Sequence, residues 1–257
     1  MRVKFTFDIP DGKLELPVHY NHAVQSMIYA SLSRQLADFL HARGFPFEKR
    51  LFRLFTFSRL SGRYRICRGG ESGPTFIVFS DTVSFYLSSP YEDILQQFAT
   101  SMLTGTQVIL NRRCLFLSSV EVLTPPVLNQ TPCLVKMLSP LVIRSTLYTP
   151  GGTKKTYYYS PLEAEFSPLI ARNLLKKYQA FYHCLPDNTA MAIRPHRFSP
   201  GRNRRQMSYK GFAITAWDGI YELSGSPRLI RFAWDCGLGE RSSQGFGMFE
   251  FWKETPR

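Results

Sequence analysis

Apolar residues along this chain are spaced first by two and then by three or four, and this order of spacings occurs twice. Residues 1–8 alternate apolar and polar side chains, with Val3, Phe5 and Phe7 on one face, which predicts a strand. Residues 21–40 carry apolar side chains at three- and four-residue intervals, which predicts one helix. In the first half, strands are further predicted at 51–57, 63–68, 75–79, 84–88, 107–110 and 116–123, with a second helix after Pro90.

The second half repeats this order of elements without repeating the sequence. Strands are predicted at 134–138, 156–159, 207–216, 221–224 and 246–252, and helices at 169–181 and 227–234. A stiff, polar stretch at 125–132 favours a boundary, giving domains 1–124 and 125–257. We therefore predict an α+β protein of two tandem ferredoxin-like (RRM-like) β-α-β-β-α-β domains, with antiparallel sheets and a cleft between the halves.

The charge of the chain indicates a polyanionic partner. Its 32 basic and 19 acidic residues leave a net charge of +13. No acid interrupts the stretch between Glu48 and Glu71 or the stretch between Asp187 and Asp218. Such stretches are either solvated faces or phosphate-binding surfaces, and their length favours phosphate contact. The candidate RNA-binding residues from these stretches are Arg50, Arg194, Arg197, Arg202, Arg204, Arg205 and Lys210.

Other classes of protein fit the sequence less well. No stretch approaches the ~20 apolar residues that span a bilayer, and the N-terminus lacks the apolar core of a signal peptide, so we expect a cytoplasmic protein without a membrane partner. The 5 cysteines are scattered and form no Cys-x-x-Cys pair. His19 and His22 have a tolerable metal-ligand spacing but no further ligand nearby. We expect neither a metal site nor a cofactor.

A glycine-rich segment near the C-terminus is the most specific local feature. Gly237 and Gly239 form one Gly-x-Gly, and after five residues Gly245 and Gly247 form another. Glycine permits positive φ angles and leaves backbone amides bare enough to approach a phosphate. The segment 237–247 is therefore either an RNA-binding loop or a tight packing element beside the sheet. A dinucleotide-binding motif fits poorly, because neither Gly-x-Gly continues as Gly-x-x-Gly.

His41 and Tyr29 have ordinary structural explanations when each is considered alone. His41 falls at the end of the predicted helix 21–40, where the helix dipole favours an imidazolium. Tyr29 suits the edge of a core on the same helix.

Together with their neighbours, these residues resemble a known family. It is the CRISPR-associated endoribonuclease family that matures guide RNA, the Cas family numbered six in the RAMP superfamily. The similarity covers nearly the whole chain. Its motifs are Pro17-x-x-Tyr20-Asn21-His22 before Gln25-x-x-Ile28-Tyr29, then Phe39-Leu40-His41, then Leu54-Phe55-Thr56-Phe57-Ser58, and the glycine-rich segment with Gly-x-Gly-Glu-Arg-Ser-Ser-x-Gly-Phe-Gly-Met.

The resemblance implies metal-independent cleavage within CRISPR repeats by the 2′-hydroxyl beside the scissile phosphate. The products would carry a 2′,3′-cyclic phosphate and a 5′-hydroxyl. By motif position His41 is the expected general acid or base and Tyr29 a second proton-transfer or positioning group. Arg53 stands where the family commonly has lysine. An arginine can stabilise negative charge on the transition state but cannot donate or accept a proton near neutral pH, so Lys49 is the alternative cation.

This assignment carries a geometric condition. Twelve residues of straight helix would separate Tyr29 from His41 by ~18 Å and turn them to different faces. The helix must therefore break near residues 31–34 if both side chains are to reach one phosphate.

The expected partner is CRISPR repeat RNA, with other CRISPR effector subunits as further candidates and either a monomer or a homodimer as the state of the chain. Two other functions remain open. Related CRISPR proteins use the same fold as non-catalytic RNA scaffolds, and a general basic RNA-binding protein would share the charge. The presence of a histidine at the family's catalytic position, His41, favours an enzyme over these two alternatives.

Overall fold

The fold is described from a computed structural model, in which residues 1–70, 73–105, 108–125, 127–128 and 131–253 are described. The predicted boundary motif 125–132 and the first residue of the predicted strand 107–110 fall partly outside these ranges. In chain order the first half contains β1 (Arg2–Asp8), β2 (Leu14–Pro17), α1 (Asn21–Ala30), α2 (Arg34–Asp38), the π-helix η1 (Phe39–Arg43), β3 (Phe45–Phe47), β4 (Arg50–Phe52), β5 (Thr56–Phe57), β6 (Ser61–Arg68), β7 (Thr75–Ser88), α3 (Glu92–Thr104), β8 (Val108–Leu110) and β9 (Arg113–Leu123).

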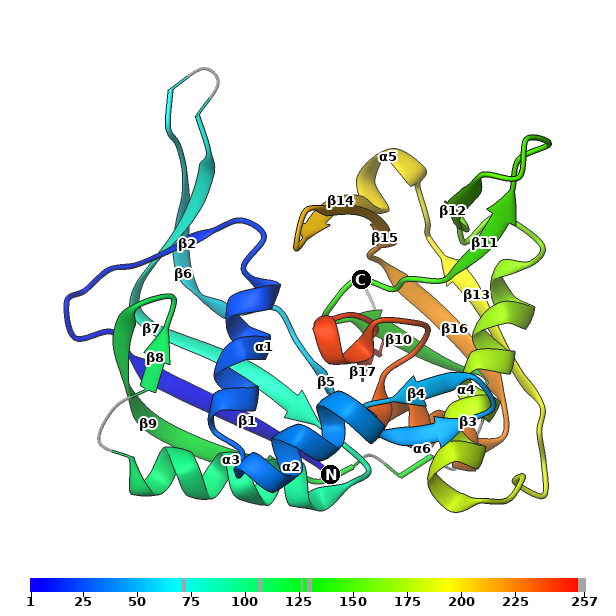
Figure 1. Cartoon of the computed structure of the whole chain (residues 1–257), viewed down its shortest axis with the longest axis horizontal. Coiled ribbons are helices and arrows are strands. Elements are labelled where there is room, and N and C mark those ends of the chain that lie inside the picture. Colours follow the sequence, from blue (N-terminus) through cyan, green and yellow to red (C-terminus); the bar gives the residue numbers. More distant parts are fainter. Residues whose placement is uncertain (71–72, 106–107, 126, 129–130, 254–257) are drawn as a thin grey trace.

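The first sheet has the ferredoxin-like strand order. β1 pairs with β7 on one side and β9 on the other, while β6 and β5 pair with the far edge of β7, all antiparallel. Val3, Phe5 and Phe7 of β1 are buried against α1 and α3, as their alternation predicts. Rings of Phe5 and Phe98 meet edge to face at 4.8 Å, which joins the sheet to α3. Both helices therefore cover one face of this sheet (Figure 1).

The second half repeats this arrangement. It contains β10 (Cys133–Met137), β11 (Arg144–Tyr148), β12 (Lys154–Tyr158), α4 (Phe166–Tyr182), β13 (Met191–His196), α5 (Pro200–Asn203), β14 (Arg204–Tyr209), β15 (Phe212–Trp217), β16 (Ile220–Gly225), α6 (Pro227–Cys236), the 3-10 helix η2 (Ser242–Gln244) and β17 (Phe249–Phe251). The sheet order is β13-β16-β10-β17, and α4 and α6 pack on it around a second core. The prediction of two ferredoxin-like units with antiparallel sheets is thus confirmed.

Three predicted elements are wrong in detail. The helix predicted at 21–40 is divided into α1, α2 and η1, because the chain turns at Ser31–Ser33 and the Ser33 hydroxyl caps α2 by accepting from the Leu36 N–H. The strand predicted at 51–57 is interrupted at Leu54, whose φ is 49°. The strand predicted at 207–216 is the hairpin β14–β15, which turns at Gly211. Conversely, 75–79 and 84–88 form the single strand β7.

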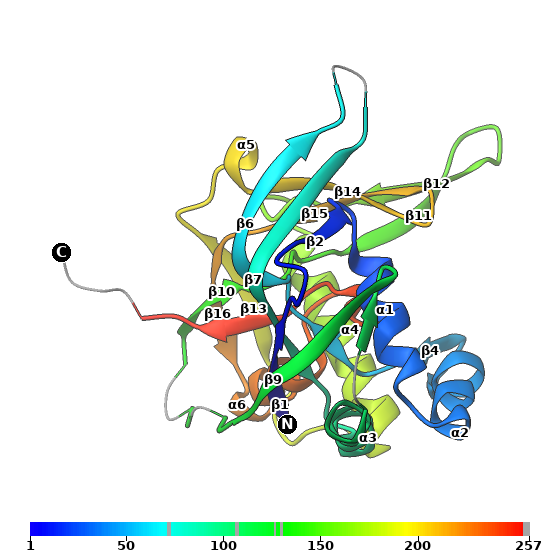
Figure 2. The same ribbon diagram turned by 90° about the vertical axis from the view of Figure 1, so that its left-hand side faces the viewer.

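Buried polar contacts fix the two halves side by side. Arg2 is 2% exposed, and its guanidinium donates to the carbonyls of Phe249 (2.7 Å) and Trp234 (2.6 Å) while lying 4.0 Å from the Trp234 ring centroid. Burial lowers the pKa of Arg2 to about 9. The N-terminal amine also pairs with Asp235 at 2.7 Å. With the halves fixed in this way, the segment 237–247 lies between them, at the centre of Figure 1. The β6–β7 hairpin projects outward from the first half in Figure 2.

Candidate active site

The break after α1 brings His41 back toward Tyr29. Both side chains line one pocket of about 440 Å³, together with Arg53 of the segment between β4 and β5. Tyr29 lies on the last turn of α1 and His41 in η1, so the turn at residues 31–33 supplies the break that the geometric condition requires. His41 is exposed and Tyr29 is half-buried.

Arg53 holds the backbone of η1 beside this pocket. Its Nε donates to the Leu40 carbonyl at 3.0 Å, and one terminal nitrogen donates to the His41 carbonyl at 2.9 Å. Its other terminal nitrogen donates to the Leu51 carbonyl at 3.1 Å. Carbonyls near a helix C-terminus lack intrahelical partners, so a cation there satisfies them and fixes the position of His41.

The environment of Tyr29 keeps its hydroxyl protonated. Burial raises the pKa of Tyr29, and the neighbouring Arg53 guanidinium only partly opposes this effect. The ring packs edge to face on Phe55 with centroids 5.9 Å apart. A tyrosine whose pKa is raised is a hydrogen-bond or proton donor near neutral pH and cannot act as a base there.

The opposite wall of the pocket comes from the second half. Tyr209 and Lys210 stand at the turn of the β14–β15 hairpin, and the Tyr209 hydroxyl donates to Gln25 of α1. Burial, with a smaller contribution from Tyr29, raises the pKa of Tyr209 to about 12. His22 of α1, in the first half, packs against this wall, with its ring edge to face with Tyr209 at 5.8 Å. Both halves of the chain therefore form the pocket.

The segment 237–247 is anchored to α1 and β5 by side-chain donors. Asn21 donates to the carbonyls of Gln244 (2.8 Å) and Gly245 (3.2 Å), and Gln25 donates to that of Ser243 (2.7 Å). Thr56 donates to the Phe246 carbonyl at 3.0 Å. These four hydrogen bonds fix the segment against the first half, with Ser243 and Gln244 facing the pocket.

The four predicted RNA-binding glycines are buried. A Cβ on Gly245 would lie 2.4 Å from the Phe57 ring, and one on Gly247 would lie 1.9 Å from the Leu238 carbonyl oxygen. Gly237 and Gly239 are likewise enclosed, by Thr56 and by Val142. Of the two interpretations left open, these contacts support packing. Contact of the segment with RNA stays a prediction, and Ser243 and Gln244 are the residues placed to make it.

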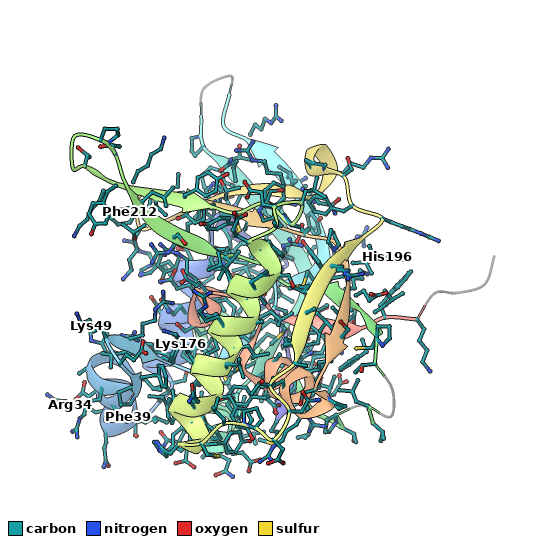
Figure 3. The ribbon with its side chains drawn as sticks, turned by 90° about the vertical axis from the view of Figure 1, so that its right-hand side faces the viewer. Arg34, Phe39, Lys49, Lys176, His196 and Phe212 are labelled. Atoms are coloured by element: carbon teal, nitrogen blue, oxygen red, sulfur yellow. The ribbon has the colours of Figure 1, made fainter. Side chains whose placement is uncertain are left out.

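The other candidate residues lie at some remove from the pocket. Lys49 is exposed on the turn between β3 and β4, at the outer edge of the molecule in Figure 3, because the hairpin directs it away. Arg50 pairs with Glu240 at 2.9 Å. Arg205 pairs with Asp218 at 2.7 Å. Exposed basic side chains on β13, α5, β14 and the connecting loop are those of Arg194, Arg197, Arg202 and Arg204.

Sequence reasoning missed several residues of the pocket. Gln25 was named in the family motif but given no role, and Tyr209 was not proposed as a site residue, because their roles depend on contacts 184 or more residues away in the chain. His22 was named in the same motif, but the one role considered for it was that of a metal ligand. Among the described residues no group of three or more His, Cys, Asp or Glu side chains could hold a metal ion. Within the same residues no helix is long and apolar enough to cross a membrane.

Comparison with known proteins gives a consistent match along the chain. Residues 123–251 match the family described as CRISPR associated protein Cas6, C-terminal, and residues 15–121 match CRISPR-associated protein Cas6, N-terminal. A curated relative from Methanocaldococcus jannaschii, named CRISPR-associated endoribonuclease Cas6 1, is 27% identical over 243 residues, covering 93% of this chain and 88% of the relative. The CRISPR-associated endoribonuclease Cas6 of Pyrococcus furiosus is 26% identical over 245 residues, covering 93% and 84%.

Solved structures show the same fold. A structure titled CRISPR associated protein Cas6 superposes with a TM-score of 0.78 at 24% identity, covering 98% of this chain and 99% of that chain. A structure of a Cas6-related gene product from Pyrococcus furiosus gives a TM-score of 0.81 at 21% identity and covers 99% of both chains.

Proposed function

This chain belongs to the Cas6 family of CRISPR-associated proteins, and from that premise we propose that it is an endoribonuclease that binds CRISPR repeat RNA and cuts the precursor transcript into guide RNAs. The names of the curated relatives support this activity. The observation that carries the proposal is the pocket lined by His41, Tyr29 and Arg53. Tyr29 and His41 would lie far apart along a straight helix, and they line one pocket because the helix is broken. We propose residues 1–124 as the domain that carries these groups and 125–257 as the domain that closes the pocket.

The proposed reaction is attack by the RNA's own 2′-hydroxyl on the adjacent phosphorus. The O2′–P bond forms, the P–O5′ bond breaks, and the products carry a 2′,3′-cyclic phosphate and a 5′-hydroxyl. One proton leaves the 2′-hydroxyl and one reaches the departing 5′-oxygen. No metal ion is needed for this balance, because side chains can supply both proton transfers.

The raised pKa of Tyr29 supports a division of roles between Tyr29 and His41. Because Tyr29 keeps its proton, it is the donor to a phosphate oxygen or to the leaving oxygen. His41 is then the group available to accept the 2′-hydroxyl proton, since an imidazole exchanges protons near neutral pH.

Arg53 acts by charge and by position. Three of its five N–H donors hold the carbonyls of residues 40, 41 and 51. The remaining donors and the permanent positive charge stabilise the extra charge of the pentavalent transition state. Lys210, on the opposite wall, adds a second cation to the same pocket. Lys49 is too far out on its hairpin to share this role.

The RNA reaches this pocket over exposed basic residues of the second half. Arg202 and Arg204 lie at α5 and at the start of β14, the strand that carries Tyr209 into the pocket. Arg205 is a weaker candidate because Asp218 already neutralises it. We propose phosphate contacts along this strand.

The test is incubation of the purified chain with CRISPR repeat RNA in EDTA, followed by end-group analysis of the fragments. Cleavage with 2′,3′-cyclic phosphate and 5′-hydroxyl ends is the expected result. A matched RNA with a 2′-deoxy sugar at the scissile position should stay intact. Equal cutting of the deoxy substrate would exclude the 2′-hydroxyl mechanism, and binding without cutting would favour a scaffold.

A further inference from the structure

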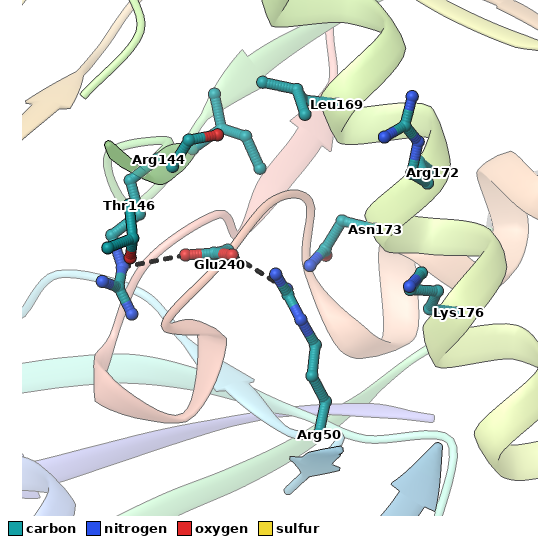
Figure 4. A pocket seen from close by; sticks show the side chains of 10 residues that line it. Arg50, Arg144, Thr146, Leu169, Arg172, Asn173, Lys176 and Glu240 are labelled. Carbon is teal, nitrogen blue, oxygen red and sulfur yellow. Dashed lines mark hydrogen bonds and ion pairs between the residues drawn. The ribbon is translucent and has the colours of Figure 1, made fainter. Parts of the chain in front are cut away.

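A second pocket of about 390 Å³ lies between α4, β11 and the segment 237–247, and no function assigned above uses it. Figure 4 shows cationic side chains converging on it from three elements, with Glu240 between them. We call it the basic pocket, and its charged and amide-bearing lining residues are Arg50, Arg144, Arg172, Asn173, Lys176 and Glu240.

The basic pocket has more positive than negative charge. Its four cations face one carboxylate, Glu240, whose side chain is 12% exposed. Glu240 receives a hydrogen bond from Arg50 at 2.9 Å and lies 3.0 Å from Arg144 Nε. Lys176 has its own partner, Glu48, at 2.8 Å, but that carboxylate is 61% exposed and is screened by solvent. The single negative charge of the enclosed Glu240 carboxylate cannot neutralise the four positive charges of the basic pocket.

The polar atoms of the pocket are also incompletely satisfied. Although Arg144 Nε is close to Glu240, its N–H makes no hydrogen bond, and the Nε of Arg241 beside the pocket makes none either. Asn173 is 4% exposed, its Oδ1 lacks a hydrogen-bond partner among the described residues, and its amide end faces Glu240 and Arg50 in Figure 4. Buried polar groups are normally satisfied, and the two arginine Nε atoms are donors that lack an acceptor, whereas the Asn173 Oδ1 is itself an acceptor that a phosphate cannot satisfy.

Three neighbouring pockets form a row from the basic pocket to the pocket of Tyr29, His41 and Arg53, which we call the His41 pocket, and we call this row the channel. A middle pocket of about 370 Å³ shares Arg50, Arg144, Asn173 and Glu240 with the basic pocket. It shares Arg53, Ser243 and Gln244 with the His41 pocket.

The floor of this channel is held by a buried lysine. Lys177 is 3% exposed and donates to the Gly237 carbonyl and the Ser242 hydroxyl, both at 2.8 Å. It fixes the segment 237–247 from the side opposite to Asn21 and Gln25. The segment that lines both the middle pocket and the His41 pocket is therefore held from two sides.

We propose that the basic pocket binds a phosphate of the same RNA strand, at a nucleotide outside the scissile position. The inference rests on the proposed function, which places the scissile phosphate at His41. Phosphate matches the site because it offers several acceptor oxygens to guanidinium and amide donors.

Arg172 is the residue that tests this proposal most cleanly. It lines the basic pocket from α4, outside the Glu240 ion pairs, and alanine suits a helix. We therefore compare Arg172→Ala with Arg172→Lys, which keeps the charge. Arg113→Ala, an exposed arginine at the start of β9 that lines none of these pockets, is the matched control. The probe is CRISPR repeat RNA with a 2′-deoxy sugar at the scissile position, so that binding is read without cleavage.

Fluorescence anisotropy across a series of salt concentrations supplies the readout. Arg172→Ala should weaken RNA binding about tenfold and lower the slope of log affinity against log salt by about 0.7, the value for one phosphate contact on single-stranded RNA. Arg172→Lys should keep the slope, and Arg113→Ala should match wild type. Shortening the RNA on one side of the scissile position should abolish the effect of Arg172→Ala.

Several results would overturn the proposal. An unchanged slope for Arg172→Ala, or an equal loss in Arg113→Ala, excludes a specific phosphate site. An effect that survives shortening of the RNA on either side places the action of Arg172 elsewhere. If wild type fails to cut unmodified RNA while the Arg172 effect on binding persists, the proposed function fails and the phosphate site stands.

Discussion

Replacement of Gly245 by alanine tests how the segment 237–247 joins the two halves. Gly245 has a φ of +81°, a conformation in which a side chain is strained. Its added Cβ would lie 2.4 Å from Cε2 and 2.7 Å from Cζ of Phe57, and 2.8 Å from the amide nitrogen of Asn21. Phe57 is 1% exposed and cannot rotate away without displacing its own neighbours.

The expected loss of stability has two parts. The left-handed backbone costs an alanine ~1–2 kcal/mol relative to glycine. Overpacking against a buried ring costs a further ~1–3 kcal/mol. The sum of ~2–5 kcal/mol is a large share of the ~5–15 kcal/mol that stabilises a typical domain. Displacement of Asn21 would also weaken its hydrogen bonds to the segment.

Gly152 provides a control, because it has a similar positive φ angle but no side chain or backbone packs against the position of an added Cβ. Its φ is +78°, and no atom lies within 4 Å of the position of an added Cβ. Gly152→Ala should therefore cost only the ~1–2 kcal/mol of backbone strain. The two variants should differ by ~1–3 kcal/mol, the overpacking cost alone.

Urea unfolding followed by tryptophan fluorescence measures this difference. All 3 tryptophans, Trp217, Trp234 and Trp252, belong to the second half, as Gly245 does. The fluorescence midpoint therefore reports on the unit that carries the substitution. Equal midpoints for Gly245→Ala and Gly152→Ala would refute the packing argument. Single-turnover cleavage by the still-folded fraction should fall for Gly245→Ala only, because that segment forms a wall of the His41 pocket.

Three further variants test the proposed chemistry and binding. His41→Ala should lower the single-turnover cleavage rate by about 10² to 10⁴ with repeat affinity nearly unchanged, whereas a mere helix cap would leave the rate of the folded protein intact. Tyr29→Phe should lower the cleavage rate about tenfold, the value of one missing hydrogen bond, and by the same factor from ~pH 6 to ~pH 9, because the raised pKa of Tyr29 keeps its hydroxyl protonated throughout this window. A loss of rate confined to the alkaline side would refute this assignment. Arg202→Ala with Arg204→Ala should lower the salt slope of RNA binding by about 0.7 for each phosphate that is no longer bound, and an unchanged slope would place the RNA elsewhere.

The order of the elements was predictable from the sequence because burial leaves a periodic signal. Val3, Phe5 and Phe7 alternate along the chain and are all buried in the first core. The division of the helix at 21–40 leaves no such signal. Leu32 and Leu36 continue the apolar spacing through the turn and both remain buried, so the pattern reads as one helix. Only the need for Tyr29 and His41 to meet predicted the break.

The site was predictable only in part, for a related reason. His41, Tyr29 and Arg53 belong to short motifs, and their types suit proton transfer and charge stabilisation. Gln25 stands in the same motif as Tyr29 and Tyr209 stands in none, but neither residue type indicates a role, since a glutamine and a tyrosine suit many environments. Their contact joins α1 to the β14–β15 hairpin, and such a pairing follows from tertiary structure alone.

The glycine-rich segment serves the pocket through its buried residues more than through its exposed ones. Gly245 and Gly247 allow the backbone to pass so close to Phe57 and Leu238 that the carbonyls of residues 243–246 come within reach of donors on α1 and β5. Two of those donors, Asn21 and Gln25, belong to α1, the helix that carries Tyr29. We therefore expect a change in the segment 237–247 to affect Tyr29, the proposed proton donor, more than two hundred residues earlier in the chain, and folding of the second half to be tightly coupled to activity in the first.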